Sequence, residues 1–116
     1  MAVIYPEEAC GLLSGEHDYV RNVFFITNSE HSKSHFFMEP VELLDALSWM
    51  DKNSQELMGI FHSHPTGPGE PSKSDIAESQ YPGVPYLIFY PGDGEWKVKG
   101  FLIEGLDIIR IEIMIE

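Results

Sequence analysis

Two histidines separated by a single residue are the most chemically informative feature of the sequence. His62 and His64 flank Ser63, and Asp75 follows a short distance downstream. Imidazoles and carboxylates bind zinc, and a set of two histidines and one carboxylate leaves the fourth position of the ion open. An open position is typical of a catalytic site. We therefore predict that His62, His64 and Asp75 bind one zinc ion (Zn2+) per chain.

A strand, a loop and a helix are needed to bring these side chains together. The apolar run Leu57–Phe61 predicts a buried strand, and residues i and i+2 of a strand point to the same face. His62 and His64 are therefore expected to project together from the C-terminal end of this strand. A loop rich in Pro and Gly, 65–71, then leads to a helix that returns Asp75 to the two histidines.

Two less specific interpretations of these residues remain open. Ser72-x-x-Asp75 also fits a variant of the capping box, in which Ser72 caps a helix that holds Asp75 in its first turn. A lone pair of histidines is often structural or simply exposed. Capping and metal binding are compatible, however, and the joint pattern of strand, loop and helix favours the metal site.

The sequence resembles the JAMM (MPN+) metalloprotease family in two motifs. The signature H-x-H-x7-S-x2-D is filled from His62 to Asp75, with Ser72 as its serine. A second element of the family, P-x-E-x-C-G-L-L-x-G, is matched by Pro6-Glu7-Glu8-Ala9-Cys10-Gly11-Leu12-Leu13-Ser14-Gly15, which makes Glu8 the matching acid. The resemblance extends over nearly the whole chain and is strongest to the compact prokaryotic members.

The resemblance implies a fold and the parts of a mechanism. The fold would be α/β: a single MPN (JAMM) domain over residues 1–116, with a mixed β-sheet flanked by helices, a cytidine-deaminase-like outline, and an N-terminal strand and helix that are short or missing. Glu8 would take a proton from a zinc-activated water, with Glu7 as the fallback. The Ser72 hydroxyl would donate a hydrogen bond to the developing oxyanion. Without the resemblance, Glu8 would be interpreted as a surface acid at a helix end.

The implied reaction is hydrolysis of an amide bond, by a peptidase or isopeptidase, beside the C-terminal tail of a ubiquitin-like or sulfur-carrier protein that ends in Gly-Gly. The main alternative is a non-catalytic MPN scaffold in a protein complex. A nucleobase deaminase is disfavoured because that chemistry expects H-x-E with P-C-x-x-C, and the chain has one cysteine. A homodimer is a possible assembly.

Composition limits the class of protein further. The 116 residues suit one domain, and a net charge of -12 argues against nucleic acid as a partner. A solvated acidic surface explains this charge more simply than a basic partner does. No apolar stretch is long enough to cross a membrane, and the N-terminus lacks the features of a signal peptide. The single cysteine, Cys10, suits a reducing compartment. We expect a cytoplasmic protein that binds neither nucleic acid nor membrane.

The remaining elements are predicted from hydrophobic periodicity and turn residues. The expected strands are Cys10–Ser14, Tyr19–Thr27, Ser34–Met38, Pro85–Tyr90, Trp96–Ile103 and a half-buried final strand Ile109–Ile115, with turns at 15–18 and 91–94. Pro40 suits the first position of a helix. The expected apolar face of this helix contains Val41, Leu43, Leu44, Leu47 and Met50, extended by Trp49.

Several other reactive residue types are expected to be structural. His17, His31 and His35 have no partners at ligand spacing and are expected on the surface. Cys10 lies in an apolar run and is expected to be a buried core thiol. Ser63 should point to the opposite face of its strand from the two histidines.

Overall fold

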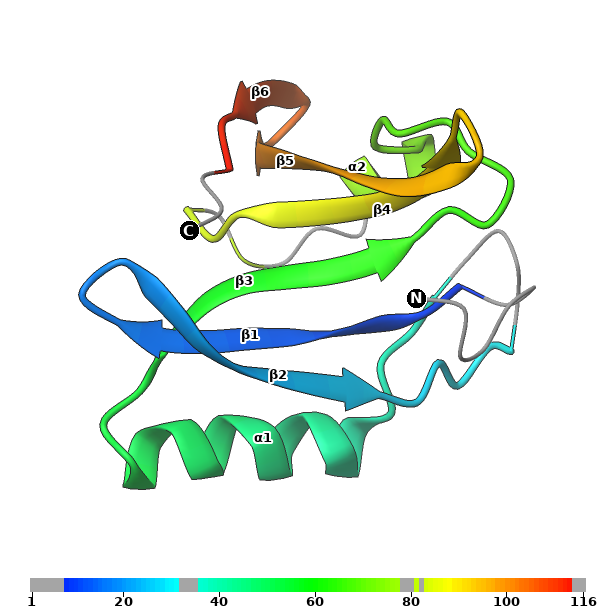
Figure 1. Ribbon diagram of the computed structural model, residues 1–116. Helices are drawn as coiled ribbons and strands as arrows, with labels where there is room; N and C mark the ends of the chain where they lie inside the picture. Colours follow the sequence, from blue (N-terminus) through cyan, green and yellow to red (C-terminus); the bar gives the residue numbers. More distant parts are fainter. Residues whose placement is uncertain (1–7, 32–35, 78–80, 82, 114–116) are drawn as a thin grey trace.

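A computed structural model describes residues 8–31, 36–77, 81 and 83–113. These residues form a six-stranded sheet in the order β2-β1-β3-β4-β5-β6 (Figure 1). The elements are, in chain order, β1 (Cys10–Glu16), β2 (Tyr19–Ile26), α1 (Pro40–Lys52), β3 (Glu56–Ser63), α2 (Lys73–Ala77), β4 (Tyr86–Gly92), β5 (Glu95–Glu104) and β6 (Asp107–Ile111). Strands β3 and β4 pair in parallel, and the other neighbours in the sheet pair antiparallel. The expected α/β fold with a mixed β-sheet is therefore confirmed.

Tight two-residue turns join the strands of two β-hairpins in the sheet. His17 and Asp18, between β1 and β2, have positive φ values of 53° and 66°, and Asp93 and Gly94, between β4 and β5, have φ values of 52° and 81°. Positive φ at both central residues matches the right-handed twist of the flanking strands. The strands therefore continue further toward each turn than the sequence predicted, so that Gly15 lies within β1.

Helix α1 begins where the sequence places it. Pro40 takes the first helical position, and the Glu39 carboxylate accepts hydrogen bonds from the backbone amides of Val41 and Glu42. Such a cap satisfies amides that have no partner within the helix. The predicted start of the helix is confirmed.

The buried stripe of α1 is narrower than the sequence predicted. Ala46 and Met50 are buried, and Leu43 and Leu47 pack beside them. Val41 and Leu44 are instead 63% and 65% exposed, so their assignment to the apolar face was wrong. Successive residues of an α-helix are turned by about 100°. The four buried or packed residues therefore point in one direction, and the side chains of Val41 and Leu44 point about 100° or more away from it.

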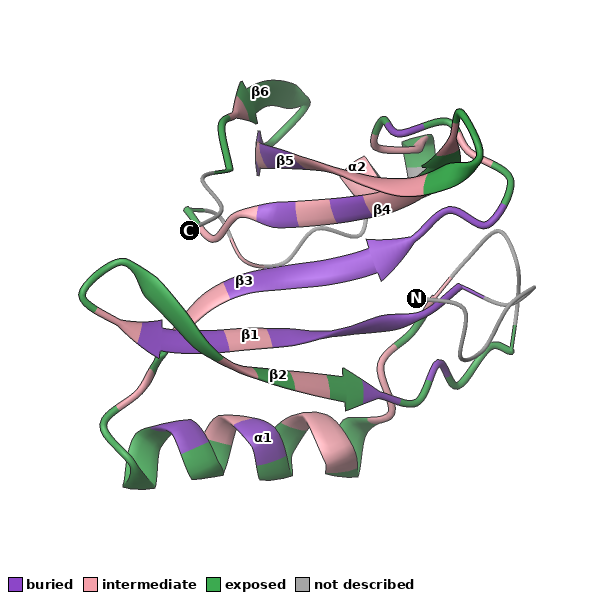
Figure 2. Cartoon of the chain, in the orientation of Figure 1, coloured by how far each residue is buried: buried purple, intermediate pink, exposed green. Residues whose placement is uncertain are grey.

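Both described helices pack against one face of the sheet. The core on this face is formed by buried residues of the strands and of α1, joined by Ile76 of α2 (Figure 2). The core residues are Cys10, Leu12, Ile26, Ala46, Met50, Ile60, Tyr86 and Ile103. Among the described residues, no helix is long and apolar enough to cross a membrane.

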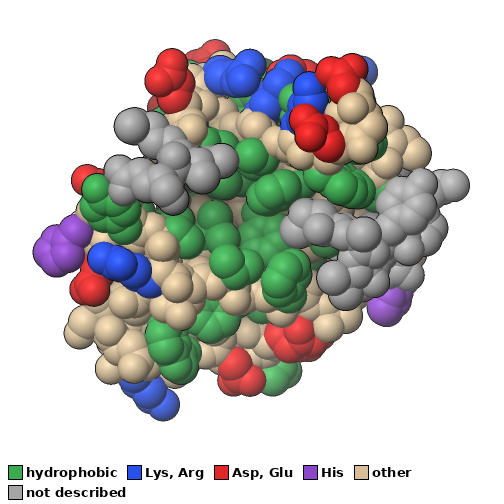
Figure 3. All heavy atoms as spheres, in the orientation of Figure 1, with side chains coloured by type: hydrophobic (Ala, Val, Ile, Leu, Met, Phe, Trp, Pro, Cys, Tyr) green, Lys and Arg blue, Asp and Glu red, His purple; other side chains and the backbone are tan. Residues whose placement is uncertain are grey.

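The opposite face of the sheet is rich in exposed apolar side chains. Phe25 of β2 is 61% exposed, and its ring lies edge-on to that of Phe61 of β3, with centroids 5.5 Å apart. Apolar side chains gather in the middle of the view in Figure 3, with charged groups toward its edges.

The last strand, β6, is also largely exposed, with Ile109 at 48%. The predicted strand Ile109–Ile115 is thus confirmed as a strand only to Ile111, and residues 114–115 lie outside the described part of the chain. Its half burial was wrong for Ile109 and Ile113, because β6 is an edge strand.

The segment expected to form a strand at Ser34–Met38 is only partly described. Residues 32–35 lie outside the described part of the chain. Of the rest, Met38 forms an isolated antiparallel bridge with Asn28. This bridge connects the end of β2 to the entry of α1.

Candidate metal centre

Strand β3 delivers the first of the predicted ligands. His62 lies opposite Cys10 of β1 in the sheet, on the face that carries the core. The side chain is 1% exposed, and its ring stacks on that of Phe36 at a centroid distance of 4.5 Å. Burial lowers the pKa of His62, so its imidazole is neutral and able to bind a metal.

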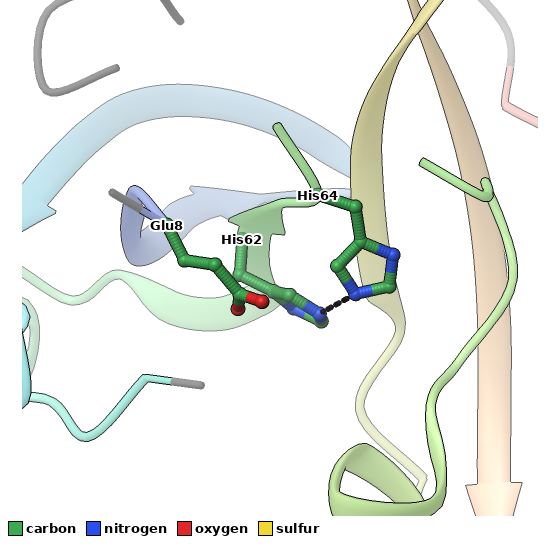
Figure 4. A group of neighbouring side chains, drawn as sticks. All are labelled: Glu8, His62 and His64. Carbon is green, nitrogen blue, oxygen red and sulfur yellow. Dashed lines mark hydrogen bonds between the residues drawn. The ribbon is translucent and has the colours of Figure 1, made fainter. Parts of the chain in front are cut away.

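His64 follows directly after β3, and its backbone is hydrogen-bonded to the parallel strand β4. Its backbone amide donates to the Phe89 carbonyl of β4 at 2.8 Å. Its ring reaches back to His62, and the two Nε2 atoms are 3.0 Å apart (Figure 4). The two imidazoles predicted to project together therefore do so.

Asp75 completes a nearly equilateral triangle of ligand atoms. Its Oδ2 atom lies 3.1 Å from Nε2 of His62 and 3.1 Å from Nε2 of His64. Ligands about 2.0–2.2 Å from a tetrahedral zinc ion would be separated by about 3.3–3.6 Å. Although burial alone would raise the pKa of Asp75, hydrogen bonds with the two histidines hold it well below its usual value. The structure thus brings the three predicted ligands together at nearly the spacing that one ion requires.

The loop after β3 fixes the tautomer of His64. Its Nδ1 atom lies 2.7 Å from the Pro68 carbonyl oxygen, which can only accept a hydrogen bond. Nδ1 therefore carries a proton, and Nε2, which faces His62 and Asp75, is left to bind either a second proton or a metal. Burial would lower the pKa of His64, but the hydrogen bonds to Asp75 and to Pro68 raise it overall. The two Nε2 atoms and Asp75 Oδ2 lie too close together to be stable without a proton or a metal cation between them.

The same loop is held against the neighbouring strands. A Cβ atom on Gly69 would come within 2.5 Å of the Tyr90 ring, so the loop lies directly on that ring. Glu70 forms an ion pair of 3.0 Å with Lys99 of β5. These contacts keep the Pro68 carbonyl in reach of His64.

Ser72 and Asp75 also form the capping arrangement that the sequence left open. The Asp75 amide donates to Ser72 Oγ at 3.1 Å, and the Ser72 amide donates to Asp75 Oδ2 at 2.8 Å. The capping interpretation is therefore confirmed. It coexists with the ligand geometry because Asp75 Oδ2 takes part in both.

Glu8 is buried beside the two histidines. It is 3% exposed, and ligand atoms of Glu8, His62 and His64 all lie within 4.8 Å of one another. Figure 4 shows its carboxylate pointing toward the imidazoles. The alternative of a surface acid was therefore wrong. Glu7, the fallback, lies outside the described residues.

The charge state of Glu8 is sensitive to its surroundings. Burial raises the pKa of Glu8 to about 7, opposed by His64 and reinforced by the negative charge of Asp75. Among the described residues, its Oε1 atom is buried without a hydrogen-bond partner, as is Nδ1 of His62. A carboxyl group with a pKa close to neutral can accept a proton and release it again at neutral pH.

Two buried polar residues beside Glu8 had no predicted function. Ser63 is 1% exposed and Asn28 is 2% exposed, and each contacts the backbone next to Glu8. The chain position of Ser63 between the histidines was the available signal, because alternation in a strand must turn it away from them. Nothing in the local sequence marks Asn28.

The residues expected to be structural behave accordingly where they are described. His17 and His31 are exposed, and His35 lies outside the described residues. Cys10 is 1% exposed and its thiol donates to the Ile26 carbonyl. These predictions are confirmed for the three described residues.

Comparison with known proteins places this chain in a family. The family model for prokaryotic homologs of the JAB domain matches residues 3–99. The chain belongs to the prokaryotic JAB family. The resemblance to JAMM (MPN+) proteins is thereby confirmed, whereas the cytidine-deaminase-like outline remains a prediction.

Curated relatives of this prokaryotic JAB chain are named as proteases. It is 36% identical to a probable TtuB-protein conjugate cleaving protease of Thermus thermophilus, over 91% of this chain and 69% of that protein. It is 37% identical to a desampylase of Pyrococcus furiosus, over 94% of this chain and 76% of that protein.

Solved structures agree on the fold. A solution structure of a Desulfitobacterium hafniense protein shares 36% identity, covers 97% of this chain and 81% of its own, and has a TM-score of 0.87. A JAB1/MPN domain protein of Archaeoglobus fulgidus, at 20% identity, matches with a TM-score of 0.59 over 95% of this chain and 79% of its own, which supports the fold alone.

Proposed function

We propose that this prokaryotic JAB chain is a zinc-dependent peptidase or isopeptidase. Its substrate would be an amide bond next to the C-terminal tail of a ubiquitin-like or sulfur-carrier protein. The observation that carries the proposal is the convergence of two imidazole nitrogens and one carboxylate oxygen, 3.0–3.1 Å apart, beside the buried Glu8. The names of the relatives from Thermus and Pyrococcus support the choice of substrate.

The donor set of the site fits zinc. His62 and His64 would contribute Nε2 and Asp75 would contribute Oδ2, which leaves one position open, as in catalytic zinc sites. The Pro68 carbonyl supports this assignment because it holds the proton of His64 on Nδ1. When bound there, a zinc ion would acidify a water molecule and polarise the substrate carbonyl.

Glu8 would transfer the proton that the reaction requires. Its carboxylate would accept the proton of the attacking water and later pass it to the nitrogen of the leaving amine. The group must be ionised before the attack and protonated after it, and the burial that raises its pKa in the metal-free protein favours the protonated state in the second step. Burial also excludes the bulk water that would otherwise compete for the same proton.

Ser72 would stabilise the charge that develops on the substrate carbonyl. Its Oγ atom accepts a hydrogen bond from the Asp75 amide. Accepting this bond uses a lone pair of the hydroxyl and not its proton, so capping and donation to an oxyanion are chemically compatible.

Metal content and cleavage together test the proposed function. Elemental analysis of purified wild type should find about one zinc per chain, lost in His64→Ala and kept in His17→Ala, which removes an exposed histidine. The wild type should cleave an amide-linked fusion of a Gly-Gly-tailed modifier and should be inhibited by a chelator. A well-folded wild type that refuses added zinc and leaves the fusion intact would instead indicate a non-catalytic scaffold.

A further inference from the structure

The peptide bond between Glu8 and Ala9 is held at both of its polar atoms by buried side chains. The Ala9 amide donates to Ser63 Oγ at 2.7 Å. The Glu8 carbonyl accepts from Asn28 Nδ2 at 3.2 Å. The plane of this peptide sets the direction in which the Glu8 side chain leaves the backbone, so the two contacts determine where its carboxylate can reach.

Ser63 ties this peptide to the strand that carries the histidines. Its own amide donates to the Ala9 carbonyl at 2.9 Å, so Ser63 contacts Ala9 with both its backbone and its side chain. In a hydrogen-bonded pair of an antiparallel ladder, the two facing residues exchange two backbone hydrogen bonds. Here the side chain of Ser63 accepts the second bond. Ser63 is the last residue of β3, and the next amide along the chain, that of His64, donates to the Phe89 carbonyl of β4.

Asn28 is itself held rigidly. Its Oδ1 atom accepts hydrogen bonds from the backbone amides of Glu30 and Phe37, at 3.1 Å and 3.0 Å. These bonds orient the amide group so that Nδ2 faces the Glu8 carbonyl. The carboxylate of Glu8, by contrast, has an Oε1 atom without a partner among the described residues. No side-chain hydrogen bond therefore holds this oxygen, which leaves the backbone contacts as the observed restraints on Glu8.

We propose that Ser63 and Asn28 are positioning residues that clamp the Glu8–Ala9 peptide and thereby fix the Glu8 carboxylate relative to His62 and His64. The clamp rests on the proposed function, since it places Glu8 for proton transfer. Removing the Ser63 hydroxyl leaves a buried amide on Ala9 without an acceptor. The segment that holds Glu8 then shifts, and a displacement of about 1 Å can lower a rate by about 10²-fold.

Ser63→Ala is the direct test with active enzyme. The variant should bind zinc with wild-type stoichiometry, because Ser63 does not contact the ligand atoms, whereas kcat should fall at least tenfold with KM unchanged. Ser63→Thr, which restores a hydroxyl, should recover most of the lost kcat. Ser14→Ala is the matched control, because Ser14 is also fully buried in β1 but bonds to Gln55, away from the site. It should keep the wild-type kcat.

A double-mutant cycle separates positioning of Glu8 from a general loss of structure. In a Glu8→Gln background, Ser63→Ala should change the residual kcat less than twofold, because it acts through Glu8. An equal fractional loss in both backgrounds would overturn the proposal, as would a wild-type kcat in Ser63→Ala. If Ser63→Ala does not fold, Ser63→Cys retains the buried volume and weakens the acceptor, and the same outcomes apply to it.

A measurement on metal-free protein decides the clamp independently of activity. In a 1H–15N NMR spectrum, the Ala9 amide proton should shift upfield and exchange faster with solvent in Ser63→Ala, and should return in Ser63→Thr. An Ala9 amide that is the same in all three proteins would exclude the clamp. If wild type neither binds zinc nor cleaves the fusion, the proposed function fails, and this comparison still decides the clamp.

Discussion

Ser72 and Asp75 cap each other at the start of α2, and the Asp75 oxygen used for capping also faces both histidines. Its Oδ2 atom accepts from the Ser72 amide at 2.8 Å and lies 3.1 Å from each Nε2 atom. A short helix is thus joined to the candidate metal centre through one atom. The hydrogen bond from Ser72 orients the carboxylate, so this candidate ligand atom already faces both imidazoles.

Substitutions at these two residues should therefore differ in their effect on the metal. Asp75→Ala removes a ligand and a cap, so we expect zinc to be absent by elemental analysis and stability to fall by about 1 kcal/mol from the cap alone. Ser72→Ala should lose a similar amount of stability but retain the zinc. If Ser72 donates to the oxyanion, its kcat should fall by about 10²–10³-fold. A Ser72→Ala enzyme with full kcat would assign this residue to capping alone.

Glu8→Gln should lower turnover strongly without loss of metal. The amide has nearly the same shape as the carboxyl group but cannot accept the proton of a water molecule. General-base catalysis is typically worth about 10²–10⁴-fold, and we expect kcat to fall within that range. Kinetics and elemental analysis on one preparation measure both quantities. Loss of zinc from this variant would instead make Glu8 a ligand.

The stability of the metal-free protein should depend on the ionisation of Glu8. Its pKa rises from 4.5 to about 7 on folding. Below pH 4.5 the group is protonated in both states and carries no penalty. Between pH 4.5 and pH 7 the unfolded state ionises while the folded state keeps its proton, so stability falls as the pH rises, by at most about 3 kcal/mol in all. Above pH 7 both states are ionised and the loss is complete.

Denaturant unfolding of chelator-treated wild type and Glu8→Gln checks this dependence. We expect the glutamine variant to gain stability relative to wild type between pH 5 and pH 8, in the direction given by the raised pKa. Groups that do not interact with Glu8 are common to both proteins and cancel in the difference, whereas His64, whose pKa the Glu8 charge raises, contributes to it. A difference that does not change with pH would show that Glu8 keeps an ordinary pKa.

Cys10 should be inert in the folded protein. Burial raises its pKa to about 12, with further contributions from Glu8 and Glu42, so little thiolate is present at neutral pH. At pH 8 we expect iodoacetamide to modify native protein far more slowly than protein unfolded in urea, as followed by mass spectrometry. Equal rates would mean that β1 opens readily around Cys10.

Local sequence patterns predicted the elements of this protein better than the contacts between them. The alternation at His62 and His64 and the Pro40 helix start depend on neighbouring residues, and both were correct. The exposure of Val41 depends on which side of α1 meets the sheet, which composition does not determine.

The setting of the candidate site could be predicted only in part. The ligand positions followed from residue types and spacing, and the match to a family motif singled out Glu8. The bonds that hold Glu8 join residues 54 and 20 positions apart, between Ala9 and Ser63 and between Glu8 and Asn28. Such contacts depend on the completed sheet, so no short pattern reveals them.

The pairing of β1 with β3 also limits when the proposed activity can first appear. Ala9 and Ser63 are 54 positions apart, and contacts over such separations form only after the entropy cost of closing the intervening loop has been overcome. Glu8 leaves the ribosome well before Asp75 is synthesised. We therefore expect a nascent chain, or an intermediate that lacks this strand pair, to be unable to cleave the proteins around it.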